Sequence, residues 1–246
     1  MSPEESPPLL RLAMWSGPRT VATALMRSFE ARGDTKVVDE PLYAHYLSAT
    51  GRVHPGNGDV LASQDLDGAA VVEDVLLAPY DAEVVFFKQM AKHLVGLDRG
   101  FLSRGPNILL TREPHDMLSS LQIQLPDVTI DDTGFVELCS ILDSVIDAGE
   151  TPIVVETKTL LQNPSGVLGA LCERVGLSFD EAMLSWPAGP KPEDGVWAEH
   201  WYDSVWESTG WQQYTPKEAE LLASAEAVLP EALAAYERLI PYQITT

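Results

Sequence analysis

The feature that most constrains the fold is a series of five short apolar runs, at residues 9–15, 35–38, 83–88, 107–111 and 152–156. Each run is nearly all apolar and rich in β-branched or aromatic residues, and each is followed by apolar residues at helical spacing. Strands that helices cover on both faces of a parallel sheet have this pattern. The sequence therefore predicts an α/β fold: a single domain with an open parallel sheet of about five strands flanked by helices.

A chain of 246 residues with 45% hydrophobic content can bury one large core without disulfides or metals. We predict a disordered N-terminal tail over residues 1–8 and a single α/β domain over residues 9–246. The two cysteines, Cys139 and Cys172, lie in apolar segments with helical spacing. They are expected to be buried thiols, as in a protein of the reducing cytoplasm.

The formal net charge of −21 argues against nucleic acid as a partner, because Lys and Arg supply the affinity for phosphate backbones. No apolar run approaches the roughly 20 residues that span a bilayer, and acidic residues stand where a secretory signal would carry basic ones. We therefore expect a cytoplasmic protein with no membrane partner. Against this acidic background, a basic residue directly after a strand is informative.

The first such place is residues 16–23 (SGPRTVAT), between the first strand and a helix expected over 21–32. Ligands of open parallel sheets bind beyond the carboxyl ends of the strands. The free N–H groups of a helix start suit a phosphate or sulfate there, with donors from Arg19, Thr20 and Thr23. The alternative is an ordinary turn with an N-cap. The segment lacks the Lys-Ser/Thr pair of a Walker A motif, which disfavours ATP hydrolysis.

The second place is residues 108–120 (ILLTREPHDMLSS), where another strand runs into a helix. Arg112 stands at the end of the strand, and Pro114 occupies the first helical turn, as proline prefers. Ser120 follows about two turns along the helix. The alternative is that Arg112 pairs with an acidic neighbour and that Ser120 is one exposed hydroxyl among many.

Together these segments resemble the sulfotransferases that use 3′-phosphoadenosine-5′-phosphosulfate (PAPS). An Arg eight residues before a Ser, with Pro two after the Arg, is similar to the segment that grips the 3′-phosphate. Residues 16–23 resemble the 5′-phosphosulfate loop, and residues 191–197 (KPEDGVW) resemble the late loop that covers the nucleotide. Residues 158–164 (KTLLQNP) resemble the family's segment after the fifth strand, with its acidic pair replaced. The resemblance implies a P-loop NTPase-like sulfotransferase fold of the bacterial small-molecule type.

The resemblance also implies a PAPS-binding set, in which Arg19 and Arg112 converge at one sheet edge. Val21 and Ala22 depart from the usual glycine and hydroxyl residue of the phosphate loop. The full implied set is Gly17, Pro18, Arg19, Thr20, Val21, Ala22, Thr23, Arg112, Ser120, Lys191, Gly195 and Trp197.

Sulfuryl transfer requires in-line alignment, cations for the leaving phosphate and a base for the acceptor's proton. Arg19 and Lys88 are the expected cations, Lys88 because it ends the third strand. The alternative for Lys88 is a surface lysine that snorkels from a buried strand.

Glu40, within residues 39–45 (DEPLYAH), is the expected base, because some bacterial sulfotransferases have a glutamate before a proline at this place. The alternative is that Asp39 and Glu40 cap the next helix. In another branch the base is a His two residues after the lysine, but Met90 stands there, which leaves His93 and His45 in reserve. The five histidines show no ligand spacing, so we predict no metal.

The predicted function is transfer of a sulfuryl group from PAPS to a hydroxyl or amine of a small-molecule acceptor, with a homodimer as one assembly option. Two alternatives remain: a non-catalytic nucleotide-binding module and an atypical P-loop small-molecule kinase. No motif reveals the acceptor. The tryptophans at 197, 201, 206 and 211 either line its pocket or, as we favour, pack the C-terminal helices.

Overall fold

The structure, a computed structural model, describes residues 9–216 and 219–246. The tail predicted for residues 1–8 lies outside the described residues. Within them, five parallel strands form one sheet in the order β2-β3-β1-β4-β5. The strands are β1 (Leu10–Ser16), β2 (Thr35–Asp39), β3 (Val84–Met90), β4 (Asn107–Thr111) and β5 (Ile153–Glu156). Each coincides with one of the predicted runs, so the predicted strands are confirmed.

The register brings the carboxyl ends of neighbouring strands to one edge of the sheet. Ser16 of the central strand β1 lies beside Met90 of β3. Among the strands on the other side of β1, Thr111 of β4 lies beside Glu156 of β5. Asp39, the last residue of β2, is paired in register with Lys88 of β3. The segments that follow β1, β2 and β4 therefore meet along this edge.

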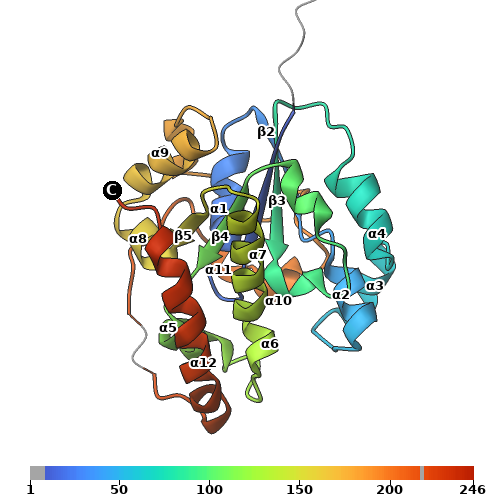
Figure 1. Cartoon of the computed structure of the whole chain (residues 1–246), viewed down its shortest axis with the longest axis vertical. Helices are drawn as coiled ribbons and strands as arrows, with labels where there is room; N and C mark the ends of the chain where they lie inside the picture. Colours follow the sequence, from blue (N-terminus) through green and yellow to red (C-terminus); the bar gives the residue numbers. More distant parts are fainter. Residues whose placement is uncertain (1–8, 217–218) are drawn as a thin grey trace, which may run out of the picture.

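Helices cover both faces of the sheet (Figure 1). They are α1 (Ala22–Glu30), α2 (Tyr43–Thr50), α3 (Asn57–Ser63), α4 (Gly68–Val71), α5 (Pro114–Leu121), α6 (Ile130–Thr133), α7 (Phe135–Asp147), α8 (Thr157–Gln162), α9 (Pro164–Arg174), α10 (Ala198–Trp201), α11 (Asp203–Trp206) and α12 (Ala223–Leu239). Short 3₁₀ turns lie at Ala91–Leu94, Gly100–Arg104, Glu181–Leu184 and Ile240–Tyr242.

One helix differs from its expected position. Apolar residues near 72–78 have the spacing of a helix, but helical structure begins at Gly68 and ends in a π-helical turn, Val72–Leu76. The Asp67 carboxylate accepts hydrogen bonds from the N–H groups of Ala69 and Ala70 and so starts the helix earlier. The stretch from 186 to 195 is irregular, as its Pro and Gly content predicts.

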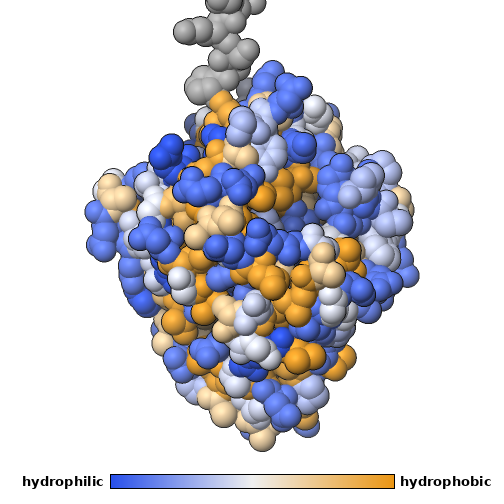
Figure 2. Space-filling view, turned by 90° about the vertical axis from the view of Figure 1, so that its right-hand side faces the viewer, coloured by the Kyte–Doolittle hydropathy of each residue, from blue (hydrophilic) through white to orange (hydrophobic). Residues whose placement is uncertain are grey.

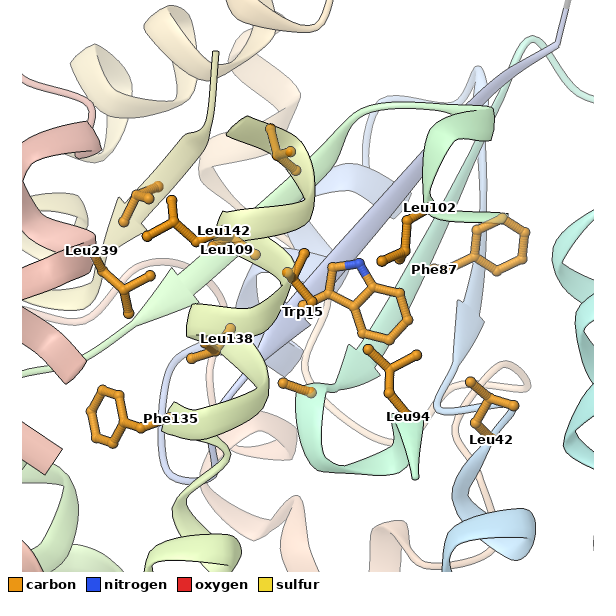
Figure 3. Packing of buried hydrophobic residues seen from close by; sticks show 14 of the residues in the cluster. Trp15, Leu42, Phe87, Leu94, Leu102, Leu109, Phe135, Leu138, Leu142 and Leu239 are labelled. Carbon is orange, nitrogen blue, oxygen red and sulfur yellow. The ribbon is translucent and has the colours of Figure 1, made fainter. Parts of the chain in front are cut away.

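Two hydrophobic clusters, one on each face of the sheet, explain why apolar and polar residues do not alternate along the strands. On one face, Trp15 and Phe87 pack with residues of α7 and α12, such as Leu138 and Leu239 (Figure 3). On the other face, Phe86 stacks on Phe29 of α1 with ring centroids 4.3 Å apart. Side chains on both sides of β3, β4 and β5 are therefore buried.

A third, smaller cluster lies beyond the end of β2. It joins α2 and α3 to residues 186–206, called here the C-terminal loop, which include the short helices α10 and α11. The contacts involve Tyr43, Tyr46, Val60, Trp197 and Tyr202. This packing brings a segment from the end of the chain beside residues that follow β2. Trp197, which we expected to pack rather than to line a pocket, is 2% exposed in this cluster.

Both cysteines are buried free thiols, as predicted. Of the described helices, none has the length and apolar character needed to cross a membrane. Figure 2 shows one face of the molecule, on which apolar side chains are interspersed with many hydrophilic ones.

Candidate active site

The turn between β1 and α1 is held in an uncommon backbone conformation. Arg19 has φ of 56°, in the left-handed region that non-glycine residues seldom adopt. Arg112 Nη1 donates a hydrogen bond to the Arg19 carbonyl oxygen at 2.8 Å. The Thr20 hydroxyl donates to the Gly17 carbonyl oxygen at 3.2 Å. The segment that follows β4 thus supports the turn that follows β1.

Arg19 and Arg112 lie together at the sheet edge between β1 and β4. Arg19 Nε donates to the Ser120 Oγ at 3.0 Å, which joins the turn to α5. Burial, and then the neighbouring Arg112 guanidinium, lower the pKa of Arg19. Arg112 Nη2 lies 3.7 Å from the Asp116 carboxylate, which balances part of its charge. Two guanidiniums this close create a positive site suited to an anion.

A second segment closes over the same turn. A Cβ atom on Gly17 would lie 2.6 Å from the Thr133 carbonyl oxygen, so only glycine fits without movement. Gly134, which joins α6 to α7 with φ of 73°, lies next to Gly17 and Ala91. The turn is therefore enclosed by the α6–α7 junction as well as by the segment after β4.

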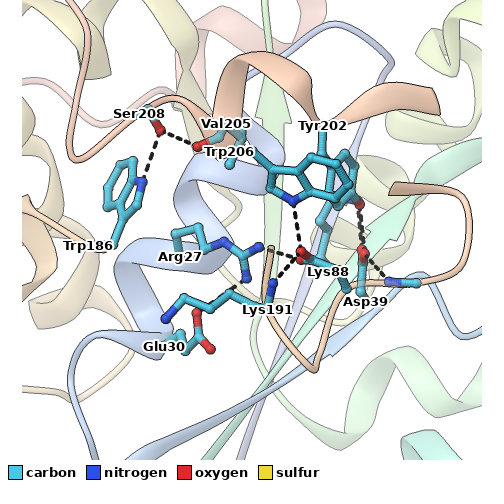
Figure 4. Close-up of polar contacts among 12 residues, drawn as sticks. Arg27, Glu30, Asp39, Lys88, Trp186, Lys191, Tyr202, Val205, Trp206 and Ser208 are labelled. Atoms are coloured by element: carbon cyan, nitrogen blue, oxygen red, sulfur yellow. Dashed lines mark hydrogen bonds and ion pairs between the residues drawn. The ribbon is translucent and has the colours of Figure 1, made fainter. Parts of the chain in front are cut away.

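Beyond β2 and β3, one lysine is buried between two carboxylates. Lys88 Nζ lies 2.8 Å from the Asp39 Oδ1 and also donates to the Glu40 Oε1 (Figure 4 shows Lys88 and Asp39). It donates to the Tyr202 hydroxyl at 2.6 Å, and that hydroxyl donates to the Asp39 Oδ2 at 2.7 Å. Lys88 is 1% exposed, so the alternative of a surface lysine is wrong.

Glu40 combines a strained backbone with a buried carboxylate. Its φ is 39°, its N–H donates to the Lys88 carbonyl oxygen at 2.8 Å, and its own carbonyl accepts from the Gln64 Nε2 at 2.9 Å. Burial raises the pKa of Glu40, Lys88 opposes that rise, and Asp39 adds to it. The balance favours a carboxylate with more basicity than a free glutamate.

His93 lies within reach of that carboxylate. Its Nδ1 is 3.9 Å from the Glu40 Oε2, and its ring stacks on those of Tyr43 and Tyr46 at centroid distances of 4.9 and 4.8 Å. Burial lowers the pKa of His93 well below its usual value, so the ring is neutral. Neither ring nitrogen has a hydrogen-bond partner within the described residues. By contrast, His45 Nε2 lies 2.9 Å from the Val95 carbonyl oxygen.

The C-terminal loop meets the carboxylate cluster, not the arginine pair. The Gly195 N–H donates to the Asp39 Oδ2 at 3.3 Å, and Trp197 Nε1 donates to the Tyr202 hydroxyl at 3.2 Å. Lys191 lies beside Glu30, at the end of α1 opposite the β1–α1 turn (Figure 4). The structure therefore does not bring Lys191 to Arg19 and Arg112, although the resemblance groups them.

A buried ion pair anchors this loop. Arg27, 1% exposed on α1, pairs with the Asp194 carboxylate, and Trp206 Nε1 donates to the same carboxylate at 3.0 Å. Sequence reasoning passed over Arg27, Asp194 and Tyr202. The pairing of Asp39 with Lys88 could have been inferred from the parallel register, but no local pattern marks Tyr202, because its partners are remote in sequence.

One group could supply ligands to a metal ion. Glu113, His115 and Asp116, at the start of α5, have ligand atoms within 4.8 Å of one another. Glu113 already accepts a hydrogen bond from the Asp116 N–H, and Asp116 accepts one from the Tyr214 hydroxyl. The expectation of a metal-free protein stays a prediction.

The sulfotransferase domain family matches residues 10–239. The chain belongs to this family. Branched-chain-amino-acid aminotransferase-like protein 1 of Arabidopsis thaliana is 41% identical over 197 residues, which are 80% of this chain and 35% of that protein. Branched-chain-amino-acid aminotransferase-like protein 2 of the same plant is 37% identical over the same shares. The chain thus spans about a third of the length of these curated relatives.

Sulfotransferase domains are also among the similar solved structures. The domain of the Synechococcus PCC 7002 olefin synthase has a TM-score of 0.48 and 17% identity, covering 95% of this chain and 98% of that chain. The domain of the curacin biosynthetic pathway has a TM-score of 0.45 and 12% identity, covering 92% and 98%. A shikimate kinase of Bacteroides thetaiotaomicron has a TM-score of 0.36 and 14% identity, covering 60% and 86%.

The family match confirms the predicted resemblance to sulfotransferases. The single parallel sheet of five strands, with helices on both faces, confirms the predicted P-loop-like α/β fold.

Proposed function

We propose that this sulfotransferase-family chain moves a sulfuryl group from PAPS to a hydroxyl or amine of a small molecule. The observation that carries the proposal is the meeting of Arg19, Arg112 and Ser120 at the carboxyl edge of the sheet. Among the described residues, no carboxylate pairs with Arg19. A nucleotide with phosphates at both ends of its ribose would supply anions to two guanidiniums that otherwise repel each other.

The proposed role of each residue follows from the contacts that its side chain makes. Arg19 and the turn that it forms would hold the 5′-phosphosulfate, while Arg112 and Ser120 would hold the 3′-phosphate. Glu40 would take the acceptor's proton, since burial makes its carboxylate more basic while Lys88 favours the charged form. Lys88 would act mainly through Glu40, because its three donor positions face Asp39, Glu40 and Tyr202.

The two alternatives have weaker support. A kinase would need the lysine and hydroxyl pair of a Walker A loop, and Val21 and Ala22 stand in this turn instead. A module that only binds nucleotide would not need a buried, strained glutamate beside a lysine, since such strain costs about 1–3 kcal/mol. We therefore favour an enzyme, acting in the cytoplasm on a small acceptor.

Mass spectrometry tests the reaction. Incubation of the protein with PAPS and a metabolite extract is expected to yield products heavier by one sulfuryl group, with release of 3′-phosphoadenosine-5′-phosphate (PAP). Phosphoryl products formed only with ATP would indicate the kinase instead. Binding of PAP with no product of either kind would favour the non-catalytic module.

Calorimetry tests the donor site. Arg112→Ala is expected to weaken PAP binding by roughly 10- to 150-fold, the loss of one charged hydrogen bond of about 1.5–3 kcal/mol. Arg104→Ala is the matched control, because Arg104 is an exposed arginine before the same strand. Unchanged PAP affinity in a folded Arg112→Ala protein would rule out this 3′-phosphate site.

A further inference from the structure

Lys92 is a cation that pairs with no carboxylate in residues 9–216 and 219–246. It follows β3 in the turn Ala91–Leu94, and its Nζ lies 5.2 Å from the centroid of the Tyr46 ring. It has no hydrogen bond or ion pair with any residue in the part of the chain that the structure describes. Burial lowers the pKa of Lys92, so the surroundings disfavour its charge. Lys92 is half-buried, so its unpaired ammonium remains open to an anion that enters from outside.

Neighbouring acidic groups do not fill this need. Both oxygens of Asp132 are engaged: Oδ1 lies 3.5 Å from Arg52, and Oδ2 accepts from the N–H and hydroxyl of Thr129. The Oε2 of Glu137 is buried and has no hydrogen-bond partner among the described residues, Lys92 included. Asp132, Glu40 and Glu137 are all near enough to favour the charged form of Lys92, but none of these carboxylates pairs with it among the described residues.

Lys92 stands between the two halves of the candidate active site. On one side its neighbour Ala91 lies against Gly134, which in turn lies against Gly17 of the phosphate turn. On the other side its neighbour His93 has its Nδ1 3.9 Å from the Glu40 carboxylate. Lys92 itself is near enough to Glu40 to lower the pKa of that carboxylate, so a molecule that presents a hydroxyl or amine to Glu40 would have Lys92 close by.

We infer that Lys92 binds an anionic group of the acceptor, so that the acceptor is a small hydroxyl or amino compound that also carries a carboxylate or phosphate. The ring nitrogens of the next residue, His93, have no hydrogen-bond partner among the described residues and add neutral hydrogen-bonding capacity. The inference rests on the proposed function, because it assigns the acceptor side of that same site. The overall charge of −21 would by itself favour a neutral or cationic acceptor, so the inference gives Lys92 a local effect opposite to that of the net charge.

The first test uses the wild-type protein, which selects its own acceptor from a mixture of metabolites. The sulfated products formed from PAPS and a metabolite extract are identified, and their precursors are sorted by charge. Precursors that carry a carboxylate or phosphate are the expected result. Neutral or cationic precursors overturn the inference while leaving the proposed function intact, whereas a complete lack of sulfuryl transfer overturns both.

The second test uses Lys92→Met with the acceptor so identified. The kcat/KM for that acceptor is expected to fall by roughly 10- to 150-fold, as for the loss of one charged hydrogen bond. Lys36→Met is the matched control, because Lys36 Nζ also lies over a tyrosine ring, 5.5 Å from that of Tyr80, but on β2 near its start. Activity of Lys92→Met equal to that of Lys36→Met overturns the inference.

PAP affinity separates the acceptor from the other source of an anion, the donor's phosphosulfate. Calorimetry of Lys92→Met with PAP is expected to give the wild-type affinity. A loss of PAP affinity as large as the loss of kcat/KM would assign Lys92 to the donor and overturn the inference. Circular dichroism of both variants confirms folding, and the wild-type product test stands even if Lys92→Met does not fold.

Discussion

At the scale of single residues, Arg19 and Glu40 share a rare property. Within residues 9–216 and 219–246, they are the two non-glycine residues with positive φ, at 56° and 39°. Such conformations cost about 1–3 kcal/mol and persist only where surrounding contacts enforce them. Here the enforcing contacts are Arg112 on the Arg19 carbonyl and Lys88 and Gln64 on the Glu40 backbone. Backbone strain therefore coincides with the β1–α1 turn, the proposed phosphosulfate site, and with Glu40, the proposed base.

Replacing Glu40 by Gln is expected to reduce kcat by about 10²- to 10⁴-fold, because the amide cannot accept the acceptor's proton. PAP affinity is expected to stay near the wild-type value, since the phosphate turn follows a different strand. Steady-state kinetics and calorimetry measure the two effects. Near-normal turnover by Glu40→Gln would remove this residue from the mechanism.

Asp39→Asn is expected to move the acidic limb of the pH–rate profile to lower pH. Asp39 and Glu40 share one ammonium, and the Asp39 charge helps to raise the pKa of Glu40. A base acts only above its pKa, so lowering that pKa extends activity to more acidic solutions while the plateau rate falls roughly 3- to 10-fold. The profile of kcat/KM against pH measures this.

Tyr202→Phe is the matched control for that shift. It removes a hydroxyl that contacts both Asp39 and Lys88 but leaves the cluster's charge unchanged. The other groups that face Glu40, namely Lys92, His93 and Tyr43, are the same in both variants. An acidic limb that stays in place in Asp39→Asn would show that Asp39 does not tune Glu40.

At the scale of elements, the β1–α1 turn and the α6–α7 junction fit together only through glycine. A Cβ at position 17 would come within 2.6 Å of a backbone oxygen, which cannot move aside as a flexible side chain can. Gly17→Ala is therefore expected to lower both Tm and PAP affinity, the latter because the phosphate turn must shift. Thermal unfolding and calorimetry measure the two effects.

Gly169→Ala is the control for that substitution. Gly169 lies inside α9, where an added Cβ meets open space. Alanine is favoured over glycine within a helix by about 1 kcal/mol, so this variant should be as stable as the wild type or more so. If Gly17→Ala were equally stable and bound PAP normally, the close packing of the turn would be irrelevant to binding.

The elements also show why strands were easier to predict than helices. Burial on both faces makes each strand a short continuous apolar run, which is visible locally. The helix that begins at Gly68 depends instead on a capping contact from Asp67, which an apolar pattern does not reveal.

At the scale of the whole molecule, the strand order places β1 at the centre of the sheet, with β4 on one side and β3 and β2 on the other. The arginine pair consequently lies on the β1–β4 side, and the carboxylate–lysine cluster lies on the β2–β3 side. Donor and acceptor chemistry would then occupy adjacent parts of one edge, as ligands of open parallel sheets do.

Hydrogen–deuterium exchange tests this division. PAP is expected to slow amide exchange in residues 17–23 and 112–120, which line the carboxyl edge, and to leave residues 33–37 and 81–84 at the opposite edge unchanged. A bound ligand slows those opening motions that expose its own site. The Arg112→Ala protein should lose most of the protection. Equal protection at both edges would contradict the assigned position of the donor.

By itself, the sequence determined the five strands, the parallel α/β class and the two basic segments that follow β1 and β4. These follow from local burial patterns and from residues close together in the chain. Only the tertiary structure decided that Lys88 is held by Asp39, Glu40 and Tyr202, that Lys191 lies beside Glu30, and that Lys92 has no anion among the described residues. Such contacts join segments up to 163 residues apart, and their geometry depends on how loops and side chains pack around them.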